Sequence, residues 1–176
     1  MPLTLLAATN NRHKLDEIRA ILAPHGIAVH SLADAGRAID VVEDQDVPLA
    51  TIEAQFGPEV AAMVAALTER KREDGVERPW EVRKREALHQ LRRAGLDAVA
   101  VKAADTLHTL RGLLAGLAAE GPSVWQKFSR GAGQSLWFYE SVAEIVRERL
   151  VEHPLADELD RAVDALEVAI AASEER

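Results

Sequence analysis

Four carboxylates lie within seven residues of the chain, in the stretch IDVVEDQD at positions 39–46. They are Asp40, Glu43, Asp44 and Asp46, and valine and isoleucine residues lie among them. A carboxylate that is buried without a partner is strongly destabilising. The acids therefore either face water at the end of a helix or hold a positive group, and a hard divalent cation is a group that carboxylates bind well.

Asp105 is a further candidate, because it lies in the middle of a predicted helix over residues 97–119. This helix is apolar nearly all round, which predicts that it is buried. A buried carboxylate has to be hydrogen-bonded, paired with a cation or bound to a metal. The spacing leaves two interpretations open: a structural salt bridge to Lys102 or Arg111, or a metal ligand.

Thr9, Asn11 and Lys14 lie just before and within the start of a predicted helix over residues 13–22. Hydroxyl and amide donors with an ammonium at a helix N-terminus make an anion site, suited to phosphate groups. The other interpretation is an ordinary N-capped helix with a lysine on its surface.

Two patterns of secondary structure meet near residue 40. Before it, short apolar runs flank the helix over 13–22 and predict a β-α-β unit. After residue 48 every periodic segment is helical, and the charged run over 69–78 is interpreted as a solvated connection. We therefore predict a mainly α fold, with a β-α-β segment at 1–39 and a helical domain at 40–176. The expected helices begin near Pro48 and Pro58 and then run over about 80–93, 97–119, 133–153 and 155–172.

The composition excludes several classes of protein. A chain of 176 residues suits one globular domain, or one domain with an appendage. The net charge of -8 disfavours binding to nucleic acid, and no apolar run approaches the length of a membrane span. The absence of cysteine excludes disulfides and thiolate metal sites and favours a cytoplasmic location.

Most of the aromatic residues lie in the last third of the chain. We interpret this cluster as packing between the late helices, with a wall for nucleotide base stacking as the alternative. The cluster consists of Trp125, Phe128, Trp137, Phe138 and Tyr139.

Four blocks of the sequence, taken in order, resemble an HD-domain phosphohydrolase of the guanosine tetraphosphate (ppGpp) hydrolase type, the hydrolase half of RelA/SpoT proteins. The blocks are DVVEDQDVPLATIEAQFGPEVAAMVAALTE, PWEVRK, VKAADTLHTLRGLL and WFYESVAEIVRERLVEHPLADEL. The resemblance covers residues 40–172 and implies an HD-like helical bundle that hydrolyses a nucleotide pyrophosphate. It implies that Asp40 and Asp105 hold a divalent metal, manganese or magnesium, and that Glu43 and Asp44 act on the attacking water.

The sequence departs from this family pattern at several positions. Ile39 stands where the metal-binding histidine of the His-Asp pair is expected, and Thr109 stands where an asparagine is expected. The helices that precede the pair in the family, and supply another histidine, are replaced by the β-α-β segment. We therefore expect the metal to be weakly bound or absent and the hydrolase activity to be impaired.

The N-terminal stretch LLAATNNRHKLDEIRAILAPHGIAVHSLADAG resembles the start of the inosine/xanthosine triphosphate pyrophosphatase family. This resemblance implies that Thr9, Asn11 and Lys14 hold substrate phosphates, and it gives pyrophosphatase activity on non-canonical purine nucleoside triphosphates as an alternative function. Together the two resemblances predict a fusion joined near residue 40. A catalytically inactive domain that binds a nucleotide or a protein is the third interpretation.

The helix over 13–22 has an apolar face that needs a partner, and the helical domain lacks its usual first helices. We expect either that this helix packs on the helical domain in their place, or that two chains associate as a homo-oligomer.

Overall fold

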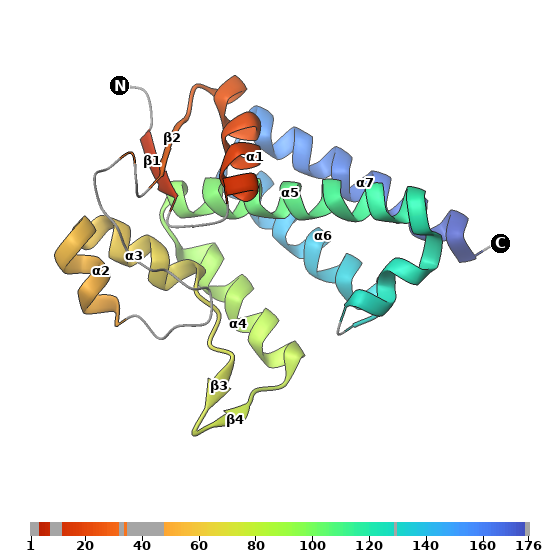
Figure 1. The fold of residues 1–176 in the computed structure, drawn as a ribbon, viewed down its shortest axis with the longest axis horizontal. Coiled ribbons are helices and arrows are strands. Elements are labelled where there is room, and N and C mark those ends of the chain that lie inside the picture. The colour runs from red at the N-terminus through yellow and green to blue at the C-terminus, as the bar shows by residue number, and fades with distance from the viewer. Residues whose placement is uncertain (1–3, 8–11, 32–33, 35–47, 129, 175–176) are drawn as a thin grey trace. The chain divides into compact units, whose positions relative to one another are not determined.

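The computed structural model describes residues 4–7, 12–31, 34, 48–128 and 130–174 (Figure 1). It divides into two compact units, residues 1–68 and 69–176. The predicted domain boundary at residues 39 and 40 lies outside the described residues and stays a prediction.

The first unit begins with the β-α-β arrangement that the sequence predicts. Strand β1 (Thr4–Ala7) is followed by helix α1 (Arg12–Leu22), the short 3-10 helix η1 (Ala23–His25) and strand β2 (Ala28–Ser31). The strands are parallel, with Thr4 opposite Ala28 and Ala7 opposite Ser31. Leu15, Ile21 and Leu22 of α1 are buried, which confirms most of the expected apolar face.

A compact turn follows β2. The backbone amide of Ser31 donates to the Asp34 carboxylate over 2.8 Å, and the amide of Asp34 donates to the Ser31 hydroxyl over 3.0 Å. The hydrogen bond from the Ser31 backbone is the main reason why the pKa of Asp34 is lowered. The Arg19 guanidinium on α1 pairs with the same carboxylate and also donates to the Val29 carbonyl over 3.0 Å, so it ties the helix to the strand.

Helices α2 (Leu49–Phe56) and α3 (Pro58–Leu67) complete the first unit and pack against each other. Each begins beside a proline, as expected, because proline suits the first turn of a helix and lacks the amide that later turns require. Gly57 lies between them with a φ of 88°, a backbone conformation that favours glycine.

The charged run over 69–78 forms a short β-hairpin, which the sequence analysis missed. Strands β3 (Arg72–Glu73) and β4 (Val76–Glu77) are antiparallel, and Asp74 and Gly75 both have positive φ in the two-residue turn between them. Such a turn matches the twist of a hairpin. The four strand residues are exposed, as expected for a solvated connection, although the sequence did not predict that this connection forms a hairpin.

Four long helices make up the rest of the second unit, which confirms the mainly α fold (Figure 1). In the unit, α5 packs against α6 and α7, α6 against α4 and α7, and the 3-10 helix η2 against α5 and α7. The helices are α4 (Trp80–Arg93), α5 (Leu96–Glu120), α6 (Ala132–Arg149) and α7 (Pro154–Glu174), with η2 (Gly121–Lys127) after α5.

Apolar stripes form the core between these helices. The predicted stripe of α7, which consists of Leu155, Leu159, Val163, Leu166 and Ile170, is buried throughout. Ion pairs reinforce the packing of α7 from the outside: Arg111 of α5 pairs with Glu158 at 3.0 Å, and Arg147 of α6 makes two 2.8 Å hydrogen bonds to Asp160.

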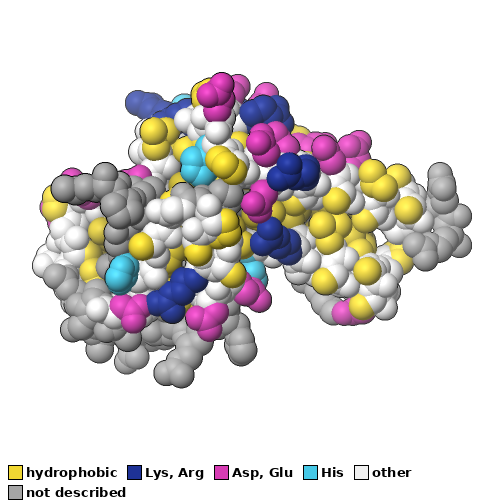
Figure 2. Space-filling model, turned by 90° about the horizontal axis from the view of Figure 1, so that it is seen from above, with side chains coloured by type: hydrophobic (Ala, Val, Ile, Leu, Met, Phe, Trp, Pro, Cys, Tyr) yellow, Lys and Arg dark blue, Asp and Glu magenta, His cyan; other side chains and the backbone are white. Residues whose placement is uncertain are grey.

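Charged side chains of both signs lie on the surface. On the face shown in Figure 2, basic and acidic side chains of the described residues are neighbours. Across the ranges that the structure describes, no helix combines the length and the apolar character that crossing a bilayer requires.

Candidate functional site

Asp105 lies near the middle of α5, on a helix whose other faces are largely buried. Its side chain is 31% exposed, whereas Ala104 and Thr106 beside it are buried. The expectation that the carboxylate is buried was therefore wrong, because it lies at the margin of the apolar face. The position lowers the cost of keeping the group charged and leaves it accessible to a ligand.

The salt-bridge interpretation of Asp105 is confirmed for Lys102. The Lys102 Nζ lies 3.3 Å from Asp105 Oδ2, one turn earlier on the same helix. Arg111, the other candidate, pairs with Glu158 of α7 instead. Because the Lys102 pair is partly exposed, it stabilises the fold only modestly.

Thr109, which replaces the asparagine expected from the family pattern, bonds within its own helix. Its hydroxyl donates to the backbone carbonyl of Asp105 over 2.9 Å. Such a bond to the preceding turn is common for threonine in a helix. The described contact of the hydroxyl thus serves the helix backbone rather than the Asp105 carboxylate.

The negative charge of Asp105 affects the pKa of Tyr139 on α6. The ring is buried, with 9% of its surface exposed. Burial is the larger cause of a raised pKa for the Tyr139 hydroxyl, and the negative charge of Asp105 raises the pKa further. The two helices therefore bring a carboxylate and a phenol under each other's electrostatic influence.

Tyr139 is the only tyrosine in the chain, so tyrosinate absorbance reports this one group. We expect the pKa of Tyr139 to lie above its ordinary value of 10.0 and to fall in an Asp105→Asn variant, while staying raised by burial. Because the pKa is raised in the folded state, the associated stability is present below pH 10.0 and is lost as the pH rises through the folded pKa. An Asp97→Asn variant removes the same charge from the exposed first turn of α5 and should leave the titration unchanged. A titration that is equal in all three proteins would contradict the influence of Asp105.

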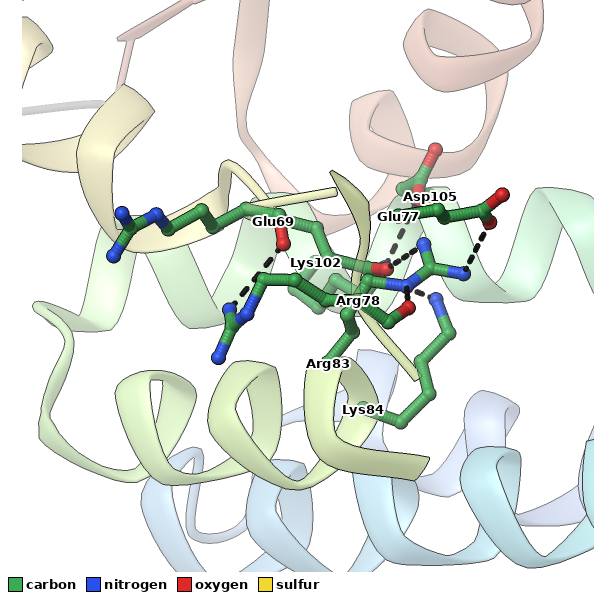
Figure 3. A network of polar contacts seen from close by, with 8 residues as sticks. Glu69, Glu77, Arg78, Arg83, Lys84, Lys102 and Asp105 are labelled. Carbon is green, nitrogen blue, oxygen red and sulfur yellow. Dashed lines mark hydrogen bonds and ion pairs between the residues drawn. The ribbon is translucent and has the colours of Figure 1, made fainter. Parts of the chain in front are cut away.

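Two lysines lie against the ring of Phe138: Lys102, already named as a partner of Asp105, and Lys84, which the sequence alone did not point to. The Nζ of Lys84, on α4, is 4.8 Å from the ring centroid, and the Nζ of Lys102 is 5.8 Å from it. Lys84 also pairs with Glu69 at 2.5 Å, and Arg83 pairs with the same carboxylate at 2.6 Å (Figure 3). Lys84 falls within the block PWEVRK, which could have drawn attention to it, but the position of both lysines at the ring of Phe138 depends on the packing of three helices.

The other sequence-predicted site residues are mostly outside the described ranges. Asp40, Glu43, Asp44, Thr9 and Asn11 all lie in segments that the structure does not describe. Lys14 lies in the first turn of α1. The proposed roles of these residues stay predictions.

The resemblance implies a divalent ion, which needs donor side chains close to one another. Within those ranges, histidine, aspartate and glutamate nowhere gather in a group of three that could hold a metal. Asp105 has an ammonium group 3.3 Å from one of its oxygens. Since a divalent ion needs several oxygen or nitrogen ligands, these donors on their own do not fit it.

Comparisons with known proteins place the chain in a family. The family model of the HD domain matches residues 6–134. A 1.85 Å crystal structure of the protein lmo0812 from Listeria monocytogenes EGD-e is similar, with a TM-score of 0.66 and 32% sequence identity, over 85% of this chain and 96% of that one. A search of curated proteins gave no match. The chain belongs to the HD domain family, whose members are in general metal-dependent phosphohydrolases.

Proposed function

We propose that the chain is a phosphohydrolase of the ppGpp-hydrolase type, acting on a nucleotide pyrophosphate with low activity. The observation that carries this proposal is the partly exposed carboxylate of Asp105 on the buried helix α5, inside the segment that matches the HD domain. The order of the sequence blocks around it supports the ppGpp type. The low activity follows from Ile39 in place of a ligating histidine.

The residues around Asp105 suit a phosphate substrate. Lys102 and Lys84 supply ammonium groups, which bind phosphate oxygens through strong charge-assisted hydrogen bonds. Asp105 would supply one oxygen ligand for the divalent ion, and the acids Glu43 and Asp44 are proposed to orient the attacking water. Cytoplasmic location and association into a homo-oligomer stay part of this proposal.

The test is the release of pyrophosphate from ppGpp in the presence of manganese. We expect slow turnover that falls at least about tenfold in an Asp105→Asn variant, because even indirect support of a metal is worth that much. The Asp97→Asn variant should keep the wild-type rate. Equal rates for the wild type and the Asp105→Asn variant would contradict the proposal.

One observation favours a second candidate, pyrophosphatase activity on inosine or xanthosine triphosphate. The β1, α1 and β2 elements form a parallel β-α-β unit with Lys14 in the first turn of its helix, where an anion would bind. However, the HD match runs from residue 6 to 134 and so crosses residue 40, which lends no support to a fusion there. Assays with inosine triphosphate and with ppGpp distinguish the two candidate functions. A Lys14→Gln variant should lose only the activity on inosine triphosphate.

A further inference from the structure

Three helices of the second unit bring together a row of aromatic rings and two ammonium groups. Trp80 begins α4, and its ring lies 6.1 Å from that of Trp137 and 6.5 Å from that of Phe138, both on α6. Lys84 of α4 lies over both Trp80, at 6.0 Å, and Phe138. We name Trp137, Trp80, Phe138, Lys84 and Lys102 the aromatic-ammonium strip.

The two ends of the strip differ in chemical character. Trp137, at one end, is 38% exposed, so part of this residue is accessible to a ligand. Phe138, in the middle, is 9% exposed, and the ammonium groups of Lys84 and Lys102 lie 4.8 and 5.8 Å from its ring centroid. Lys102, at the other end, is next to Asp105. The strip therefore leads from an exposed aromatic ring, past two positive charges, to the carboxylate of the proposed active site.

Two ammonium groups near one ring repel each other, and negative groups beside them offset this repulsion. Among the residues that the structure describes, Lys84 pairs with Glu69 and Lys102 pairs with Asp105. A lysine ammonium has three N–H donors, so one carboxylate does not use up its capacity. The side chains of Lys84 and Lys102 keep 21% and 27% of their surface exposed, which leaves both accessible to a soluble anion.

We propose that the aromatic-ammonium strip binds a nucleoside diphosphate. The base stacks on Trp137 and Trp80, and the pyrophosphate lies between the ammonium groups of Lys84 and Lys102, beside Asp105. Stacking on aromatic rings is favourable for every base, so this end of the strip does not select one base over another. Glu69 acts as a positioning residue, because it pairs with both Arg83 and Lys84 on α4. The inference rests on the proposed function, for which it names the residues that hold the substrate.

Calorimetry with guanosine diphosphate and with inorganic pyrophosphate tests the strip directly. The titrations use the full chain in a buffer with a metal chelator, so that they do not depend on hydrolysis or on a bound ion. We expect Lys84→Gln and Lys102→Gln to weaken the binding of both ligands by about tenfold each, because each removes a charge-assisted hydrogen bond. Trp137→Ala should weaken the binding of guanosine diphosphate by about fivefold or more and leave the binding of inorganic pyrophosphate unchanged.

Matched variants separate these effects from general damage to the protein. Arg85→Gln removes one positive charge from the exposed side of α4, and Trp125→Ala removes a tryptophan that lies against Phe128 instead of the strip. Both should bind as the wild type does. Lys84→Arg and Lys102→Arg keep the charge and should retain most of the binding, which excludes misfolding as the cause of the loss in the glutamine variants.

The outcomes distinguish this inference from the proposed function. Absence of guanosine diphosphate binding at millimolar concentration, or equal affinity in the Lys84→Gln, Lys102→Gln and Arg85→Gln variants, would overturn the strip as a binding site. Hydrolysis of ppGpp by lysine variants with unchanged ligand affinity would overturn it too, while leaving the phosphohydrolase in place. Binding with the expected losses, in a protein that does not hydrolyse ppGpp, would support the strip and count against the proposed reaction.

Discussion

Replacing Ile39 with histidine is expected to raise the affinity of the chain for manganese by at least about tenfold. The family pattern has a ligating histidine at this position, and a neutral imidazole is a good ligand for a divalent transition metal. Loss of a residue that only supports a ligand costs roughly 10- to 100-fold in affinity, so restoring a ligand should recover at least that much. Calorimetric titration of manganese into the wild type and the Ile39→His variant measures the difference.

Two further variants make the manganese experiment specific. Adding Asp105→Ala to Ile39→His should remove the gain, because the proposal has both residues hold the same ion. Leu49→His places a new histidine on an exposed position of α2 that the family pattern does not assign to the metal, and it should have no effect. Tight manganese binding by the unmodified chain would contradict the weak site that Ile39 predicts.

Replacing Leu159 with alanine should lower the free energy of unfolding of the second unit by about 2–5 kcal/mol. Leu159 is fully buried in the stripe of α7 that packs against α5 and α6. Truncating it removes apolar contacts and leaves a cavity that well-packed helices cannot close completely. This is a large part of the stability of a typical domain, about 5–15 kcal/mol.

Urea denaturation followed by tryptophan fluorescence measures this loss in the right part of the chain. All three tryptophans, Trp80, Trp125 and Trp137, lie in the second unit, so the signal reports the helices around α7. Val168→Ala, on the same helix at a position that is 69% exposed, should change the free energy by no more than about 0.5 kcal/mol. Similar losses in the two variants would show that the stripe of α7 does not form the core.

The two experiments address different properties of this HD domain, the packing of its core and the metal site that we propose to be impaired. The stripe of α7 and the apolar faces of α5 are buried, whereas residue 39, where the resemblance implies a ligating histidine, is an isoleucine. A protein with the expected stability and weak manganese affinity would be a folded member of the family with an impaired centre. Strong activity would instead require that other residues replace the missing imidazole.

Much of the architecture was predictable because it depends on local patterns. The periodic apolar residues of α5 and α7, and the prolines at the starts of α2 and α3, predicted those helices to within about two residues, the usual uncertainty of a helix boundary. The β-α-β unit was predicted from short apolar runs on either side of α1, and its parallel pairing follows from the crossover helix. The Lys102 and Asp105 pair was predictable because residues three apart on a helix are neighbours.

Other features could not be predicted because they depend on which helices meet. The hairpin over 72–77 has strands of only two residues, which are too short for a period to be recognised. The charged residues around its turn are also typical of a solvated connection.

The exposure of Asp105 likewise depended on how α5 packs, since a helix that is apolar nearly all round does not indicate which edge faces solvent.

The aromatic cluster shows most clearly what the sequence by itself determined and what only the tertiary structure decided. Composition and position placed five aromatic residues in the late helices, but the structure divides them: Trp125 pairs with Phe128, whereas Trp137 and Phe138 join Trp80 from α4. Lys84 and Lys102 are 18 positions apart on separate helices, and only the packing of α4 and α5 around α6 brings both to the ring of Phe138. Local periodicity determines which residues form a helix and which face is apolar, because those depend on near neighbours in the chain. The meeting of side chains from three helices depends on long-range packing, and that decided the arrangement of the candidate site.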